Sequence, residues 1–231
     1  MLDSTETLRN PELFFEHFLK IIDKSGNLVP LVLNSAQSTV YSKLCKKNLI
    51  LKARQTGVST LIQAEIFRRM AFQSTSALTL AHNDTTTQML RDVFDRYYNN
   101  FPEFPDFKLN RVQANDRVTK FSNTGSRHII GTAGNTEIGR GGTYNVCHFT
   151  EVAFWKDAEK IVNGAMQGGN PQVILESTPN GAQGYFYQLR MDALAGRNDW
   201  NLIFMPYTEF PEYMTPGWAE AKRRELGRYF D

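Results

Sequence analysis

An apolar segment that runs directly into a short polar loop, and then into an amphipathic stretch, constrains this chain more than any other feature. Residues 50–60 read Ile-Leu-Lys-Ala-Arg-Gln-Thr-Gly-Val-Ser-Thr, and an amphipathic segment of helical character follows over 61–71. A strand that enters a glycine-containing loop and then a helix N-terminus is the layout of a phosphate-binding loop. Backbone N–H groups receive anionic oxygens there. The sequence therefore predicts a strand, a phosphate-binding loop and a helix in this order.

The loop departs from the usual pattern of such sites, G-x-x-x-x-G-K-[ST]. That pattern requires glycine at position 52 and lysine at position 58, where this chain has Lys52 and Val58. Gly57 and Ser59 do fall where the pattern places them. The loop is therefore a deviant form of the pattern, with its lysine at the front edge. Such a deviation distinguishes between families of phosphate-binding proteins better than a regular loop would.

Length and composition are those of a globular α/β domain with a substantial core. The chain has 231 residues, 41% of them hydrophobic, and a mean hydropathy of −0.41. No run approaches the ~18 apolar residues of a spanning helix. Two cysteines, Cys45 and Cys147, are too few for a disulfide framework, so we expect both to be small buried apolar residues in a reducing compartment.

Charge is distributed unevenly along the chain. The net charge of +2 is too small to indicate nucleic-acid binding by itself. Between Lys24 and Ala64, however, there are six basic residues and no Asp or Glu. This excess suits a polyanionic ligand, although a solvated basic face is the alternative.

Strand and helix patterns alternate along the chain, which predicts a mostly parallel central sheet with helices on both faces. We expect one domain over residues 1–231, with about 1–33 as an N-terminal helical extension and 101–115 irregular. Helices are predicted at 11–23, from about 35, and at 61–72, 84–100, 156–166, 184–195 and 218–229. Strands are predicted at 48–53, 77–81, 144–149, 173–175 and 202–205, with a hairpin of 117–122 and 126–132.

An acidic residue, Glu151, follows the apolar strand at 144–149. The carboxyl ends of strands in α/β sheets are where ligands bind. A carboxylate there can orient a water for attack on a γ-phosphate, although an acid at the start of a helix is the plainer explanation. Thr150 occupies the position where many NTPases have an aspartate that holds the magnesium shell. Either Ser59 and water carry the metal, or magnesium binds poorly until a nucleotide arrives.

Three further segments carry candidate polar groups. Thr178 and Asn180 follow the strand at 173–175 and could sense a γ-phosphate, although Pro-Asn-Gly is also good turn chemistry. Arg140 lies among glycines, which suits an arginine finger that reaches a phosphate across an interface, or a plain surface arginine. Gln37 could read an adenine edge with its amide.

Together these segments resemble the ATPase domain of the large terminase subunit of tailed bacteriophages, the motor that packages double-stranded DNA into procapsids. Lys52–Thr60 resembles the deviant Walker A loop, Tyr144–Glu151 the Walker B segment and Ser177–Gly181 the coupling motif. Gln37 matches the adenine motif, and residues 139–142 match the arginine-bearing loop. The resemblance implies a P-loop NTPase fold of the additional-strand catalytic-glutamate type.

The resemblance also implies roles and partners. Glu151 would activate water and Arg140 would act in trans, while Thr178 and Asn180 would link hydrolysis to movement. Ser59 and Glu151 would bind Mg²⁺. The loop would bind the ATP phosphates, with Lys52 or Arg54 as the cation and Thr60 as a reserve hydroxyl. The remaining residues that line it would be Gln55, Thr56, Gly57 and Val58.

Outside the domain, the resemblance implies double-stranded DNA, a portal protein, a small terminase subunit and a homo-oligomeric ring as partners, and no membrane. The expected location is the cytoplasm of the infected bacterial host, with transient docking at the procapsid portal. The family's C-terminal nuclease is not expected in this chain. Two alternatives stay open: a helicase-like or repair ATPase that acts on DNA, and a non-catalytic nucleotide-binding or scaffold module, which Val58 and Thr150 would favour.

Overall fold

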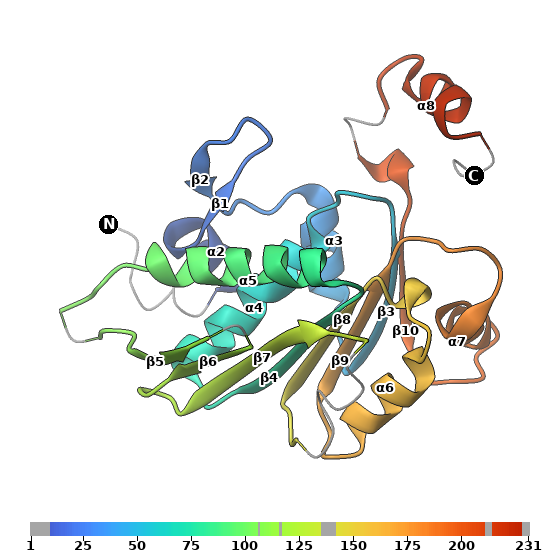
Figure 1. Ribbon diagram of the computed structural model, residues 1–231. Helices are drawn as coiled ribbons and strands as arrows, with labels where there is room; N and C mark the ends of the chain where they lie inside the picture. Colours follow the sequence, from blue (N-terminus) through green and yellow to red (C-terminus); the bar gives the residue numbers. More distant parts are fainter. Residues whose placement is uncertain (1–9, 106, 116, 135–141, 211–213, 228–231) are drawn as a thin grey trace.

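The computed structural model describes residues 10–105, 107–115, 117–134, 142–210 and 214–227. Its centre is an eight-stranded sheet with the order β10-β3-β9-β8-β4-β7-β6-β5 (Figure 1). The parallel part comprises β10 (Asn201–Met205), β3 (Lys47–Lys52), β9 (Gln172–Ser177), β8 (Val146–Thr150), β4 (Ser76–Ala81) and β7 (Ser126–Thr132). β6 (Val118–Phe121) and β5 (Arg111–Ala114) continue the sheet in antiparallel fashion.

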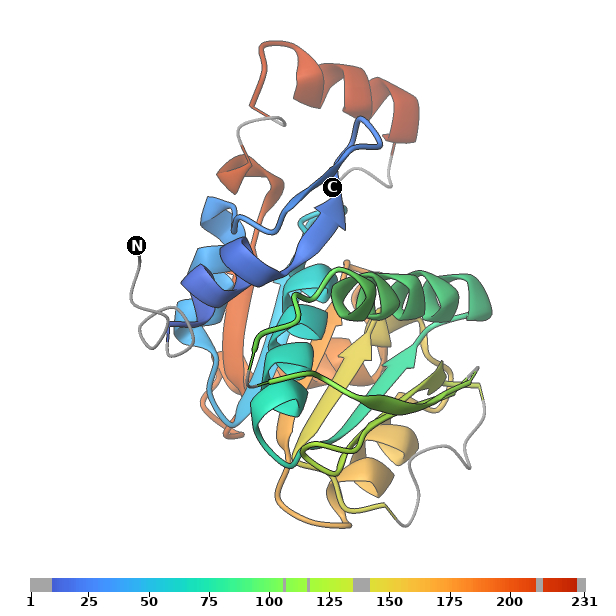
Figure 2. The same cartoon turned by 90° about the vertical axis from the view of Figure 1, so that its left-hand side faces the viewer.

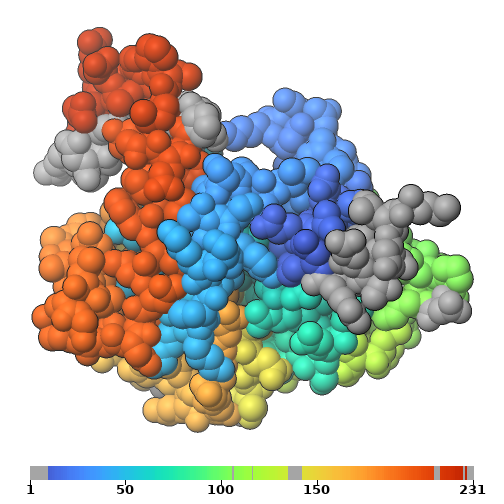
Figure 3. Space-filling model, turned by 180° about the vertical axis from the view of Figure 1, so that it is seen from behind, coloured from blue at the N-terminus to red at the C-terminus, as the bar shows by residue number. Residues whose placement is uncertain are grey.

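Helices cover both faces of this sheet (Figures 1 and 2). One face carries α2 (Pro11–Phe18), α3 (Ser35–Lys43), α4 (Val58–Phe72) and α5 (Asp84–Asn99). The other carries η1 (Val152–Phe154), α6 (Ala158–Met166) and α7 (Gly184–Leu194). After η2 (Tyr207–Glu209), α8 (Trp218–Leu226) projects from the same side of the molecule as the hairpin of β1 (Lys20–Ile22) and β2 (Leu28–Pro30) (Figures 1 and 3).

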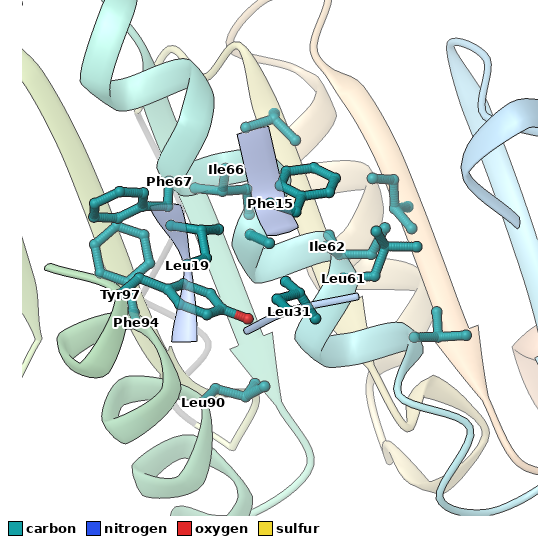
Figure 4. Packing of buried hydrophobic residues seen from close by; sticks show 14 of the residues in the cluster. Phe15, Leu19, Leu31, Leu61, Ile62, Ile66, Phe67, Leu90, Phe94 and Tyr97 are labelled. Atoms are coloured by element: carbon teal, nitrogen blue, oxygen red, sulfur yellow. The ribbon is translucent and has the colours of Figure 1, made fainter. Parts of the chain in front are cut away.

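The apolar core is divided by the sheet into two clusters. In the cluster around α4, the ring of Phe67 lies 5.4 Å from that of Phe94 and 5.9 Å from that of Tyr97, in edge-on contacts (Figure 4). Helix α4 buries residues on nearly all its sides, which is typical of a helix enclosed between a sheet and other helices. Its N-terminus is thereby fixed relative to the end of β3.

The predicted α/β fold with a mostly parallel sheet is confirmed. Strand β9 lies between β3, which enters the phosphate-binding loop, and β8, which ends at Thr150. This inserted strand is the feature expected for the additional-strand type of P-loop NTPase. No helix in the described ranges is long and apolar enough to cross a membrane.

Some local predictions were wrong. The predicted helix at 11–23 ends at Phe18, and a two-stranded hairpin follows, β1 (Lys20–Ile22) with β2 (Leu28–Pro30). Its turn is stabilised because the Asp23 carboxylate accepts hydrogen bonds from the backbone N–H groups of Ser25 and Asn27.

Two further corrections concern single segments. Residues 101–115 are not irregular throughout, since Arg111–Ala114 forms β5 by pairing with β6. Cys45 is exposed, whereas Cys147 is buried as expected. Lys43, Lys46 and Lys47 surround Cys45 in sequence, and its position after the end of α3 leaves it at the surface.

Candidate nucleotide-binding site

The phosphate-binding loop connects Lys52, the last residue of β3, to Val58, the first residue of α4. Gly57 caps the helix in the left-handed conformation, with φ 74°. The backbone angle favours glycine, and a Cβ atom at this position would lie 2.7 Å from Nε2 of Gln37, so that side chain would have to move. No side chain of the described residues caps the first turn of α4, so its N–H groups face the loop and suit an anion.

A lysine side chain lies buried at the front edge of the loop. Val58, at the position of the usual lysine, is buried in the core with 1% of its surface exposed. Lys52 is 7% exposed, and its Nζ lies 3.3 Å from Oε1 of Glu151 and 3.7 Å from Oε2 of Glu176. Burial alone would lower the pKa of Lys52, but the two carboxylates outweigh burial and raise it. Lys52 is therefore charged and lies inside the site, whereas Arg54 is at the exposed surface of the loop.

Glu151 follows β8 in a left-handed conformation, φ 56° and ψ 41°, which is unfavourable for a residue with a side chain. This turn directs the carboxylate toward the ends of the neighbouring strands. Oε2 accepts hydrogen bonds from the Thr178 hydroxyl at 2.9 Å and the Thr178 backbone N–H at 3.2 Å. Glu151 thus lies between Lys52 and the segment that follows β9.

Glu176, which our reading of the sequence missed, is the most buried acid of the site. Its side chain is 0% exposed, and Oε1 lies 2.5 Å from Oγ of Ser59 and 2.9 Å from Nε2 of His148. Burial alone would raise the pKa of Glu176, but the charge of Lys52, followed by His148 and Ser59, lowers it to about 2. A signal was present in the sequence, because a carboxylate that ends an apolar strand must find a partner.

The remaining candidates lie at several places around the loop. Gln37 donates from Nε2 to the Gly57 carbonyl at 2.8 Å and accepts at Oε1 from the Asn34 N–H at 3.0 Å, so its amide bonds to the loop and to the cap of α3. Asn180 donates to the Ala153 carbonyl at 3.0 Å, beside the turn that holds Glu151. Reading of adenine by Gln37 stays a prediction.

The other loop residues differ in accessibility. Gln55 is exposed and has φ 55°, and Thr56 is 2% exposed. The Thr60 carbonyl accepts a hydrogen bond from the Tyr97 hydroxyl at 3.1 Å, which ties the first turn of α4 to α5. Arg140 lies outside the described residues.

The donor set of this site is made of oxygens, which suits a hard cation such as Mg²⁺. Ser59 offers a hydroxyl, and Glu151 and Glu176 offer carboxylates. In the part of the chain that the structure describes, no group of three or more His, Cys, Asp or Glu side chains forms a metal site by itself. A magnesium ion here would therefore depend on nucleotide phosphates and water, which is common for this ion.

Comparison with known proteins identifies the fold. Neither a protein-family model nor a curated protein sequence matches the chain. The large terminase ATPase domain of Thermus phage P74-26 matches with a TM-score of 0.65 and 15% identity over 84% of this chain and 89% of that one. The large terminase of bacteriophage HK97 matches with a TM-score of 0.69 and 16% identity, over 97% of this chain and 49% of that one. The large terminase of the thermophilic bacteriophage D6E, in complex with ADP, matches with a TM-score of 0.58 and 16% identity, over 86% of this chain and 51% of that one.

A helicase is a weaker match. The UvsW helicase of bacteriophage T4 has a TM-score of 0.52 and 10% identity, over 88% of this chain and 68% of that one. The chain spans about half of the HK97 and D6E proteins and most of the P74-26 domain. It has the fold of the ATPase domains of bacteriophage large terminases, as the sequence resemblance implied.

Proposed function

We propose that this chain is the ATP-hydrolysing motor domain of a viral terminase large subunit, which translocates double-stranded DNA into a procapsid. One observation supports the proposal independently of the similarity in fold. The Glu151 carboxylate lies 3.3 Å from the loop cation Lys52 and accepts hydrogen bonds from Thr178. An acid, a phosphate-binding loop and a polar strand end therefore meet at one edge of the sheet, as ATP hydrolysis requires.

In this proposal the triphosphate of ATP lies against the N-terminus of α4, where N–H groups and the charge of Lys52 stabilise its oxygens. Glu151 orients a water for in-line attack on the γ-phosphorus. A bond forms from the water oxygen to phosphorus and one proton of the water passes to the Glu151 carboxylate. The bond from phosphorus to the β–γ bridging oxygen breaks, and ADP and phosphate leave. Magnesium, when bound near Ser59 and Glu151, would neutralise developing negative charge.

The assembly around this site follows from the same proposal. Arg140 would reach the ATP of a neighbouring subunit in a homo-oligomeric ring, and Thr178 would transmit the state of the site to the segment after β9. Double-stranded DNA, a portal protein and a small terminase subunit are the proposed partners, in the cytoplasm of an infected bacterial host. DNA contacts would be directed to phosphates, so they should weaken with salt.

Glu151→Gln tests the function directly. The amide keeps the shape of the side chain but cannot act as a base, so we expect ATP hydrolysis to fall by about 10²–10⁴-fold while ATP binding persists. Turnover would be measured with DNA and an assembled ring, and binding by calorimetry. Hydrolysis at the wild-type rate would refute the role of Glu151.

A helicase-like ATPase is the second candidate, favoured by the likeness to the T4 UvsW helicase. The two functions differ in what happens to the duplex. A packaging motor moves along intact double-stranded DNA, whereas a helicase separates strands. Displacement of a labelled strand by the wild-type protein and ATP would favour the helicase, and translocation without displacement would favour the motor.

A further inference from the structure

Glu176 and Thr150 are neighbours across the sheet. The register of β8 with β9 pairs Thr150 with Glu176. Paired residues of parallel strands project from the same face, about 4.8 Å apart. Both residues therefore face α4, whose first turn carries Ser59. The carboxylate on this face is therefore Glu176 on β9. Strand β9 lies next to β3 and its phosphate-binding loop, whereas Thr150 lies on β8, one strand farther away.

The Glu176 carboxylate is only partly satisfied. Oε1 accepts from the Ser59 hydroxyl at 2.5 Å and lies 2.9 Å from Nε2 of His148. Oε2 is buried and has no hydrogen-bond partner within the described ranges; the Lys52 ammonium lies 3.7 Å away. A fully buried carboxylate oxygen without a hydrogen bond is costly and calls for an explanation. A ligand that completes its bonding when it binds is such an explanation.

His148 fixes the orientation of this carboxylate. Nε2 of Gln63 is a donor, and it lies 3.0 Å from Nδ1 of His148 and 3.1 Å from the Thr79 hydroxyl. Nε2 of His148 in turn lies 2.9 Å from Oε1 of Glu176, so the ring is held between Gln63 and the carboxylate. Hydrogen-bonded partners of this kind typically orient a carboxylate near a metal.

We propose that Glu176 supplies, from β9, the carboxylate that orients the Ser59 hydroxyl and the water shell of the magnesium ion that arrives with the nucleotide. The inference rests on the proposed function and extends it. Glu176 is a positioning residue, because it acts through Ser59 and water. Thr150 is consistent with this role: an acid there would lie one strand spacing from Glu176, and the two negative charges would repel each other.

Metal-dependent nucleotide binding tests the proposal without measuring turnover. Affinity for ADP would be measured by calorimetry with Mg²⁺ and with a chelator, and the ratio of the two compared between variants. In Glu176→Gln we expect this ratio to fall by about 10–100-fold, as for other groups that support a metal. Affinity with the chelator should stay near that of the wild type. Glu65→Gln is the matched control, since Glu65 is a buried acid of the same helix as Ser59 and pairs with Arg68.

An exchange of the acid between the two strands makes the test specific. Thr150→Asp combined with Glu176→Gln returns one carboxylate to the same face, so the effect of magnesium should recover at least in part. If Glu176 serves only as counter-ion to Lys52, Glu176→Gln changes ADP affinity by the same factor with and without magnesium, and this result overturns the proposal.

Three other outcomes are equally decisive. If Glu176→Gln does not fold, the exchange variant decides alone, because it keeps one buried acid on this face of the sheet: a retained effect of magnesium supports the proposal and its loss overturns it. A wild-type protein that binds neither ADP nor ATP would refute the proposed function as well. If the wild type binds ADP and Glu176→Gln behaves like the Glu65→Gln control, this inference alone is refuted.

Discussion

The Thr178 hydroxyl donates a hydrogen bond of 2.9 Å to Oε2 of Glu151, and the backbone N–H of Thr178 donates another of 3.2 Å to the same oxygen. On its other side Glu151 lies 3.3 Å from Nζ of Lys52. The proposed catalytic acid is thus bonded to the segment after the adjacent strand β9 and to the end of β3, two strands away. A phosphate that attracts Lys52 would leave Thr178 as the main partner of Glu151, which links nucleotide binding to the segment after β9.

Replacement of Thr178 by valine removes the hydroxyl while the shape of the side chain is conserved. A hydrogen bond to a charged group is worth about 1.5–3 kcal/mol, so we expect hydrolysis in the assembled motor to fall by roughly 10–100-fold. ADP affinity should change little, because Thr178 contacts the acid and not the loop. Thr178→Ser keeps the hydroxyl and is the control. Equal activity of the valine and serine variants would contradict a role for this hydrogen bond.

Arg140→Ala tests the proposed action in trans, which rests on the sequence alone because Arg140 lies outside the described residues. We expect a loss of about 10³–10⁵-fold in ATP turnover, the usual range for an arginine finger. Mixing this variant with Glu151→Gln should restore part of the activity. In such a ring a Glu151→Gln subunit can offer its arginine to a neighbour that still has the acid. If no mixing ratio restores turnover, Arg140 does not act across an interface.

Much of the site could be predicted because its parts follow a general rule: the carboxyl ends of parallel strands meet at one edge of a sheet. That rule brought Lys52, Glu151 and Thr178 together from three separate segments. Glu176 escaped prediction since its partners depend on the order β3-β9-β8, which no local pattern encodes. The hairpin from Lys20 to Pro30 was missed for another reason: a short apolar run fits helix and strand equally well.

Gln37 allows two roles to be separated by experiment. Its amide donates to the Gly57 carbonyl at 2.8 Å, which positions the phosphate-binding loop, whereas the sequence predicts that it reads adenine. Gln37→Ala should lower ATP affinity under either role. If Gln37 recognises adenine, the variant should also lose its preference for ATP over GTP, measured as the ratio of the two affinities in competition experiments. An unchanged ratio of the two affinities, with both reduced, would assign Gln37 to the loop.

The buried acid Glu65 makes stability depend on pH in a predictable direction. Burial alone would raise its pKa, but Arg68 and Arg69 outweigh burial and lower it below the ordinary 4.5. The folded state thus favours the ionised form of Glu65. The stabilisation is complete above pH 4.5 and is lost as the pH falls through the lower pKa of the folded state.

Arg68→Met should reduce the free energy of unfolding by about 1–3 kcal/mol near neutral pH, in urea titrations. The difference from the wild type should shrink in acid. Arg197→Met, which breaks the exposed pair with Asp192, should change stability little at any pH. A difference for Arg68→Met that stays constant down to acidic pH would show that Arg68 stabilises the protein through packing and not through the charge of Glu65.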